Sequence, residues 1–350
     1  MPVRLGRAAA AELVLVVPDL LAPLSAPDWD PALGPRAPAL EALLARGRWG
    51  PARTDGYEAT LFDLLAAYPA DERSLPIAEP CYRLDTQRQA AGSVLRADPV
   101  HLEAGIDELV LTPARDLAIN EAEATALAAA LSTHFESRGW RIEAPLPERW
   151  YLSAEQLPPL LALPPSRVIG RNPRAHLPEG SDARHWIAVL NEIQMLLHEH
   201  PVNRDREAAG RRPINGLWLW GAGPSGQRDS LIAGRVWARD ALARALAEAA
   251  GLRCSELPVS LSDLEPDGRY LVVIDDLLWP ARQGRNDQWS AALEAVNDRF
   301  LEPALRGLGR TWRTIEILPC DARSCRLRDS DRWRVWRRPR PLSTWAPAEQ

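Results

Sequence analysis

The sequence contains no lysine, and arginine supplies all 42 basic side chains among its 350 residues. A coding bias is the simplest origin of this absence, but the chemical consequence is the same whatever the origin. No side chain can form a lysine Schiff base or act as a general base through a deprotonated ammonium group. Every cationic contact to a ligand falls to guanidinium groups, which stay protonated.

Histidine and cysteine are also scarce. The six histidines are His101, His134, His176, His185, His198 and His200, so none follows residue 200. The second half of the chain therefore offers no imidazole to a metal ion. The four cysteines include no Cys-x-x-Cys pair, which is typical of reduced thiols in a cytosolic protein.

Long apolar runs are absent, since no stretch approaches the length of a membrane-spanning helix. Arg4 and Arg7 precede an apolar run, as in a secretion signal, but Glu12 interrupts that run and Pro18 ends it, which favours a buried strand. A net charge of −5 argues against a general nucleic-acid-binding or membrane-surface protein. We expect a cytoplasmic protein that binds neither nucleic acid nor membranes.

Short apolar runs alternate with longer amphipathic stretches along most of the chain. Strands are predicted at 13–17, 107–111, 140–146, 216–220, 269–276, 314–321 and 332–338, and helices at 37–47, 58–68, 120–137, 182–200, 235–250 and 287–307. Asn120 and Glu123 predict a capping box. The alternation predicts an α/β fold, with a doubly wound, mostly parallel sheet flanked by helices and an inserted smaller α/β cap. We place the core at 1–75 and 181–350, and the cap with its linkers at 76–180.

Several predicted strands end in a carboxylate. These strand-end acids are Asp19, Asp275, Asp276 and Asp321. In open α/β sheets, ligands bind outside the carboxyl ends of the strands, where carboxylates can hold divalent metals. Aspartate is also common in loops and helix caps, so each of these residues has a structural explanation as well.

The stretch 198–223, "HEHPVNRDREAAGRRPINGLWLWGAG", admits three interpretations. His198 and His200 suggest a metal site, but residues two apart point to different faces of a helix and no third ligand is near. Arginines and asparagines, with the backbone amides of residues 221–223, would suit a phosphate or carboxylate. The third interpretation is purely structural. The polar side chains concerned are Asn203, Arg204, Arg206, Arg211, Arg212 and Asn215.

Residues 332–341, "RWRVWRRPRP", interleave arginine with tryptophan. Such a pattern occurs in nucleic-acid-binding patches, where bases stack on aromatic rings. A strand whose arginines reach solvent along their aliphatic stems explains it equally well. The acidic net charge favours the strand.

The stretch 198–223 resembles a motif of the 2,3-bisphosphoglycerate-independent phosphoglycerate mutases, above all of their archaeal-type branch. The matching residues are His200, Pro201, Val202, Asn203, Arg206, Gly210, Pro213, Asn215, Gly221 and Gly223. The whole chain is similar to the RpfE-type regulatory proteins, through "RADPVHLEAG", "ERWYL" and "LNEIQMLLHEHPVN". The resemblance implies the fold of the alkaline phosphatase superfamily, with two metal ions and a serine nucleophile in its active members.

The chain departs from that implied pattern at the nucleophile and at the metal ligands. Asp19 fits the ligand on the first strand, but Glu58 stands near the serine position and Thr60 is the only hydroxyl within reach. The late strand-end acids have no histidine beside them, whereas the resemblance implies several. Carboxylates alone would hold Mg²⁺ weakly.

We therefore expect a catalytically degenerate, phosphoglycerate-mutase-like protein with a regulatory or metabolite-sensing role, no cofactor and no bound metal, the strand-end acids being vestigial ligands. A small phosphorylated or carboxylated metabolite would bind through His200, Asn203, Arg206 and Asn215. One alternative is a divergent phosphomutase or phosphohydrolase that acts on a small phosphorylated metabolite with Mg²⁺ or Mn²⁺ and uses Thr60 as nucleophile. A second alternative is a protein-interaction scaffold, whose partner the sequence does not identify.

Overall fold

The computed structural model of the chain describes residues 11–26, 29, 34–66, 72–104, 109–223, 230, 234–264 and 268–346. The basic N-terminal stretch that includes Arg4 and Arg7, the last two residues of the predicted helix 58–68 and the first two of the predicted strand 107–111 lie outside these ranges.

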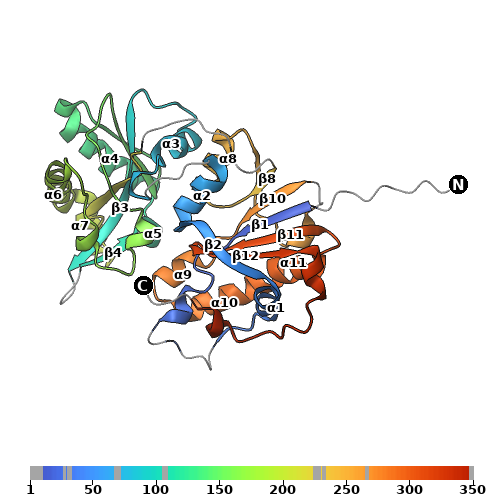
Figure 1. Cartoon of the computed structure of the whole chain (residues 1–350). Helices are drawn as coiled ribbons and strands as arrows, with labels where there is room; N and C mark the ends of the chain where they lie inside the picture. The colour runs from blue at the N-terminus through green and yellow to red at the C-terminus, as the bar shows by residue number, and fades with distance from the viewer. Residues whose placement is uncertain are drawn as a thin grey trace. The chain divides into compact units, whose positions relative to one another are not determined.

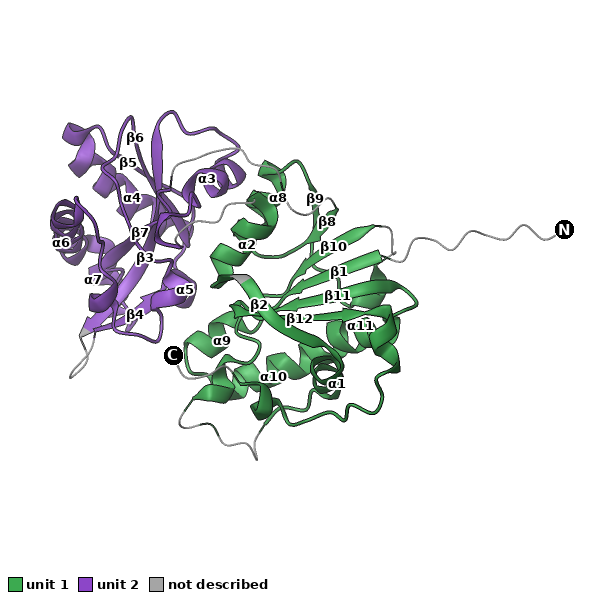
Figure 2. Cartoon of the chain, viewed as in Figure 1, with its two compact units in different colours: residues 1–69, 228–350 green, residues 70–227 purple. Residues whose placement is uncertain are grey.

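The chain forms two compact units, coloured separately in Figure 2. The core unit comprises Met1–Pro69 and Arg228–Gln350, and the inserted unit comprises Ala70–Gln227. Each unit contains its own sheet.

The core unit is built on a seven-stranded sheet with the strand order β2-β12-β11-β1-β10-β8-β9 (Figure 1). The strands are β1 (Ala11–Val16), β2 (Arg48–Asp55), β8 (Arg235–Trp237), β9 (Arg253–Ser255), β10 (Arg269–Val273), β11 (Trp312–Leu318) and β12 (Asp321–Arg328). From β11 to β9 all neighbours run parallel, while β12 and β2 add two antiparallel strands at one edge. The expected mostly parallel α/β sheet is thus confirmed.

Helices cover both faces of the core sheet. Leu13 and Leu15 of β1 pack in one hydrophobic cluster with Leu40 and Leu43 of α1 (Pro38–Arg46) and with Trp289 of α10 (Asn286–Val296). Figure 1 shows α2 and α8 on the opposite face from α1, α10 and α11. The helices are α1 (Pro38–Arg46), α2 (Tyr57–Ala66), α8 (Ala241–Ala249), α9 (Leu278–Arg282), α10 (Asn286–Val296) and α11 (Glu302–Gly307), with a π-helical turn at Asn297–Leu301. The central strand is buried on both faces because helices lie on both, which explains its unbroken apolar run.

The inserted unit has a second, antiparallel sheet that surrounds the long strand β3. Its strands are β3 (Ser93–Ala104), β4 (Leu109–Pro113), β5 (Arg141–Leu146), β6 (Arg149–Ala154) and β7 (Gly216–Trp220), and its helices are α3 (Ala78–Thr86), α4 (Glu121–Phe135), α5 (Pro165–Val168), α6 (Ala183–Glu199) and α7 (Pro201–Ala208). β3 pairs with β4, β6 and β7, and β6 pairs with β5. The predicted capping box of α4 is confirmed, since the Glu123 amide donates to Asn120 Oδ1 and the Asn120 amide to Glu123 Oε2.

The boundary of the insertion differs from the expected one, because residues 181–227 lie in the inserted unit and not in the core. β7 decides this difference, since it pairs with β3 instead of joining the parallel sheet. Two indole N–H groups fix it there: Trp218 donates to Leu163 O at 2.8 Å and Trp220 to Asp98 Oδ2 at 2.8 Å. The alternation of strands and helices predicted that this strand exists, but its expected place in the parallel core sheet is wrong.

Two other element predictions are wrong. Residues 235–237 form strand β8, and α8 begins only after Asp240, whose Oδ1 accepts the Ala243 amide at 2.9 Å. Residues 332–338 form no strand, because a short 3-10 helix, Asp329–Trp333, is followed by irregular backbone.

No helix in the described ranges combines the length and the apolar character needed to cross a membrane.

Candidate functional site

The polar stretch that follows α6 is folded as helix α7 and its two ends. Pro201 occupies the first turn of α7, and His200 Nδ1 accepts the Val202 amide at 3.3 Å. Asn203 is buried, donates to Leu197 O and Ile214 O, and accepts from the Ile214 amide at 2.7 Å. Its amide group is therefore used to join the end of α6 to the start of β7.

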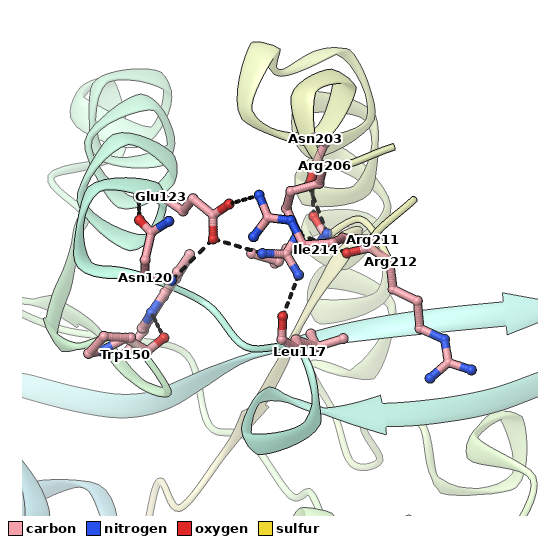
Figure 3. Close-up of polar contacts among 10 residues, drawn as sticks. Leu117, Asn120, Glu123, Trp150, Asn203, Arg206, Arg211, Arg212 and Ile214 are labelled. Atoms are coloured by element: carbon pink, nitrogen blue, oxygen red, sulfur yellow. Dashed lines mark hydrogen bonds and ion pairs between the residues drawn. The ribbon is translucent and has the colours of Figure 1, made fainter. Parts of the chain in front are cut away.

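Arg206 is completely buried at the centre of a charged cluster (Figure 3). Its Nε donates to Arg212 O at 2.8 Å, its Nη1 to Glu123 Oε2 at 2.7 Å, and its Nη2 to Leu117 O at 2.5 Å. Arg211 donates to the other oxygen of Glu123 at 2.7 Å. Burial by itself raises the pKa of Glu123, but the Asn120 amide, Arg211 and Arg206 together hold it below its ordinary value.

The remaining motif residues also bind the chain itself. Asn215 Oδ1 accepts the Leu102 amide at 2.7 Å and its Nδ2 donates to Leu102 O, as in a strand pair. A Cβ on Gly223 would lie 1.9 Å from Ser74 O, so this glycine is required for close packing. The geometry thus favours the structural interpretation of the stretch over the metal or phosphate interpretations. A ligand role for His200, Asn203, Arg206 and Asn215 is not needed to explain their presence.

We predict that Glu123→Ala lowers the free energy of unfolding by about 3 kcal/mol, because it leaves the Arg206 charge buried with no counter-ion. Denaturant unfolding followed by tryptophan fluorescence measures this loss. Since the pKa of folded Glu123 lies below its ordinary value, the wild-type advantage is full above the unfolded-state pKa and disappears as the pH falls through the folded one. Glu121→Ala, on the exposed first turn of the same helix, is the matched control and should cost little.

The strand-end acids gather at one edge of the core sheet, where the parallel strands end. Val16 is in register with Val273 of β10 and Leu318 of β11, so the loops that follow these three strands are neighbours. The Asp19 amide donates to Pro319 O at 3.1 Å, which ties two of the loops together. Asp19 and Cys320 adopt φ values of 54° and 64°, a region that non-glycine residues occupy rarely and often at functional sites.

Three of the four strand-end acids have an arginine partner. Arg282 Nε of α9 lies 2.7 Å from Asp19 Oδ2, and Arg239 Nη2 lies 2.5 Å from Asp276 Oδ2. Arg323 donates to Asp321 through both Nε and Nη2. Each of these carboxylates therefore has a permanent positive charge within contact distance.

Asp275 differs from the other three because its main neighbours are acids. Burial, followed by the charges of Asp240 and Asp276, raises the pKa of Asp275 from 3.8 to about 6. Burial, followed by the charges of Asp240 and Asp275, holds the pKa of Tyr57 well above its ordinary value. Ionisation of Asp275 is thus opposed by burial and by the negative charges of Asp240 and Asp276.

The position expected for a nucleophile lies on the first turn of α2. Thr60 is buried, donates its hydroxyl to Gly56 O at 2.7 Å and lies 3.1 Å from the Thr54 hydroxyl. Cys320 is the other nucleophilic group nearby, but burial and the surrounding carboxylates hold the pKa of its thiol well above the ordinary range. Because the thiolate is the reactive form, this raised pKa makes Cys320 a poor nucleophile.

These residues do not fit the two-metal site that the sequence resemblance implies. Within the described ranges, no three side chains from histidine, cysteine, aspartate and glutamate are grouped so that they could hold a metal ion. Guanidinium groups occupy the places beside Asp19, Asp276 and Asp321. The sequence identified the acids, but it did not identify Arg282, Arg239 or Asp240 as their neighbours. Only the order of acids after strands pointed to this edge.

We predict that Asp275→Asn stabilises the core unit at neutral pH. A pKa raised from 3.8 to about 6 means that ionisation of Asp275 costs folding stability as the pH rises through this interval. The gain should be about 3 kcal/mol at pH 7.5 and should vanish at about pH 3, where the carboxyl is neutral in both states. Thermal unfolding across this pH range measures it. Asp276→Asn, which loses the Arg239 partner instead, should give no gain.

Comparison with known proteins gives partial but consistent matches. No protein-family model matches the chain. The chain is 30% identical over 179 residues to the 2,3-bisphosphoglycerate-independent phosphoglycerate mutase of Methanothrix thermoacetophila, which is 45% of each protein. It is 33% identical over 165 residues to mutase 2 of Methanothermobacter thermautotrophicus, covering 43% of this chain and 40% of that protein. The chain thus spans less than half the length of these two relatives.

A longer match exists to the mutase of Methanosarcina acetivorans, with 22% identity over 314 residues, 81% of this chain and 77% of that protein. Among solved structures, the cofactor-independent phosphoglycerate mutase of Thermoplasma acidophilum aligns with 90% of this chain and 89% of its own at 18% identity and a TM-score of 0.38. A protein of Pyrococcus horikoshii aligns over 91% and 88% at 14% identity and a TM-score of 0.47. The sequence matches relate the chain to the cofactor-independent phosphoglycerate mutases.

Proposed function

We propose that this chain is a catalytically degenerate relative of the phosphoglycerate mutases that has a regulatory or metabolite-sensing role. The observation that carries the proposal is the pairing of Asp19, Asp276 and Asp321 with arginines at the edge where active relatives would use carboxylates to bind metal. A guanidinium neutralises a carboxylate, but it has no open coordination position for a phosphoryl oxygen.

The arginines oppose a metal for an electrostatic reason. Two unit charges 4 Å apart repel by about 4 kcal/mol at an effective dielectric constant of 20, and a divalent ion doubles that figure. Arginine cannot lose its proton to relieve this repulsion. A cation beside Asp19 or Asp276 would first have to displace Arg282 or Arg239.

The ligand chemistry of the core unit points in the same direction. No histidine follows residue 200, so the late strands supply only carboxylate and thiol groups. At the nucleophile position, Glu58 has no hydroxyl and the Thr60 hydroxyl is directed to a backbone carbonyl. Within the described residues, Asp275 has no salt bridge. The enzymatic alternative, a phosphomutase or phosphohydrolase dependent on Mg²⁺ or Mn²⁺, would therefore need a weak metal site formed by Asp275 and Asp240.

The regulatory part of the proposal is supported by the sequence resemblance to RpfE-type proteins. A protein that keeps a mutase scaffold without its metals can still recognise a small phosphorylated or carboxylated metabolite, because recognition requires only donors of the right charge. The protein-interaction scaffold stays the other non-enzymatic alternative.

We predict that the purified protein has no phosphoglycerate mutase activity in the presence of Mg²⁺ or Mn²⁺ and contains no stoichiometric metal. Coupled assay of 3-phosphoglycerate conversion and elemental analysis measure the two quantities. The Methanothrix thermoacetophila mutase, assayed in parallel, is the positive control. Turnover together with a bound metal that Asp275→Ala removes would establish the enzymatic alternative.

We predict that removal of the two guanidinium groups creates a cation site. The double variant Arg282→Gln, Arg239→Gln should gain thermal stabilisation by Mn²⁺ that the wild type lacks, about 1.4 kcal/mol when the metal is at ten times its dissociation constant. Arg306→Gln, which changes an exposed arginine paired with Glu302 on α11, is the matched control. If the double variant folds but shows no response to Mn²⁺, the arginines are not what excludes the metal.

We predict that 3-phosphoglycerate or inorganic phosphate raises the unfolding temperature of the wild-type protein in the presence of a metal chelator. Differential scanning fluorimetry with sulfate at equal ionic strength as control measures the shift. No shift with either compound would count against metabolite sensing and favour the scaffold.

A further inference from the structure

The C-terminal segment of the core unit exposes aromatic side chains that the sequence suggested were part of a strand. After the 3-10 helix Asp329–Trp333, the backbone is irregular until a second 3-10 helix, Leu342–Trp345. Trp333 is 65% exposed and Trp336 is 71% exposed, with Val335 between them at 67%. Exposed tryptophans this close together are unusual on the surface of a globular protein.

The segment is held in place by contacts with the core unit. Arg334 Nη1 donates to Arg46 O at 3.1 Å and its Nε lies 3.1 Å from Asp331 Oδ1, and Arg337 Nη1 donates to Gly47 O at 3.4 Å. At its far end, Leu342 is buried in the hydrophobic cluster of the core. Its shape is therefore set before any partner binds, which lowers the entropic cost of association.

Trp345 is fixed by a stack of its own. Its ring lies 5.6 Å from that of Trp49 at an angle of 19°, and the Arg323 guanidinium lies 5.0 Å from the centre of the Trp49 ring on β2. Arg323 Nη1 also donates to Trp345 O at 3.1 Å. The Trp345 ring is thus held in a fixed position, whereas the Trp336 side chain is largely exposed.

A cavity of about 530 Å³ lies along this segment, and all its lining residues belong to the core unit. They are Ala45, Trp336, Arg337, Arg338, Arg340 and Trp345. Arg338 and Arg340 are exposed and, within the described part of the chain, have no ion-pair or hydrogen-bond partner. We call this cavity the Trp/Arg groove. The groove brings two indole rings together with guanidinium groups that have no carboxylate partner among the described residues.

We propose that the Trp/Arg groove binds an acidic peptide segment of a partner protein, with an apolar side chain of the peptide between Trp336 and Trp345 and its carboxylates on Arg338 and Arg340. Guanidinium groups bind carboxylates as bidentate forks. Tryptophan and arginine are also the residue types that contribute most binding energy at protein interfaces. The net charge of the chain, −5, makes the groove a local exception in an acidic molecule.

The same charge distribution disfavours nucleic acid as the occupant. A single-stranded nucleic acid needs a positive track along several nucleotides, and its phosphates beyond the groove would meet an acidic protein. A short acidic peptide places its charge only where the arginines are. Peptide binding at the groove does not depend on whether the strand-end acids are catalytic. Each of the two proposals can therefore fail while the other stands.

The test is selection from a random dodecapeptide library displayed on phage, with the full-length protein as bait. Sequences that combine aspartate or glutamate with leucine or an aromatic residue should be enriched. The selected peptide, labelled with fluorescein, should bind the wild type in fluorescence polarisation and weaken at least tenfold in Arg338→Glu, Arg340→Glu. Trp336→Ala should also weaken it, and the affinity should fall as salt is raised.

Matched controls separate this site from general electrostatics. Arg306→Glu reverses the charge of an exposed side chain on α11 and should leave peptide affinity unchanged. Far-ultraviolet circular dichroism checks that each variant is folded. Enrichment of neutral or basic peptides, equal binding by the double charge reversal, or stronger binding by oligo(dT) or by phosphatidylserine vesicles than by the selected peptide would overturn the proposal.

Discussion

The neutralisation of buried and half-buried carboxylates by arginine is the interaction on which the rest of this structure depends. At the carboxyl edge of the core sheet, Arg282 faces Asp19 and Arg239 faces Asp276. Without these charges, several acids would converge at the end of a buried sheet with no counter-ion, which is strongly destabilising. Each of these two arginines therefore supplies the counter-ion for one carboxylate at this edge of the sheet.

The inserted unit also contains a buried carboxylate that is neutralised by arginine. Arg206 is completely buried and joins Glu123 to the backbone of two other segments. Because a guanidinium has several donors in a fixed plane, one side chain can satisfy carbonyl and carboxylate groups that lie in different directions. A chain without lysine is well supplied with such side chains. The presence of Arg206 in this motif does not require a ligand, since all three of its guanidinium nitrogens donate to acceptors of the chain itself.

In the Trp/Arg groove, arginine side chains are exposed to solvent instead of being buried among acceptors. Arg206 is surrounded by acceptors from its own unit, whereas Arg338 and Arg340 have no described partner and lie beside exposed indole rings. The difference is one of environment and not of chemistry. It separates the arginines that complete the fold from those whose guanidinium groups are exposed, and the latter are the basis of the proposed peptide site.

The sequence by itself determined the α/β class, the strands β1, β10 and β11, the cap of α4 and the positions of the strand-end acids, because these follow from local periodicity and from the residue types that end strands and begin helices. Only the tertiary structure decided that β7 joins the antiparallel sheet, that Arg282 faces Asp19, and that residues 332–338 form no strand. Pairing partners are chosen by burial and by contacts between residues far apart in the chain. Arg282 and Asp19, more than two hundred and fifty positions apart, meet only because β1 and β10 lie side by side.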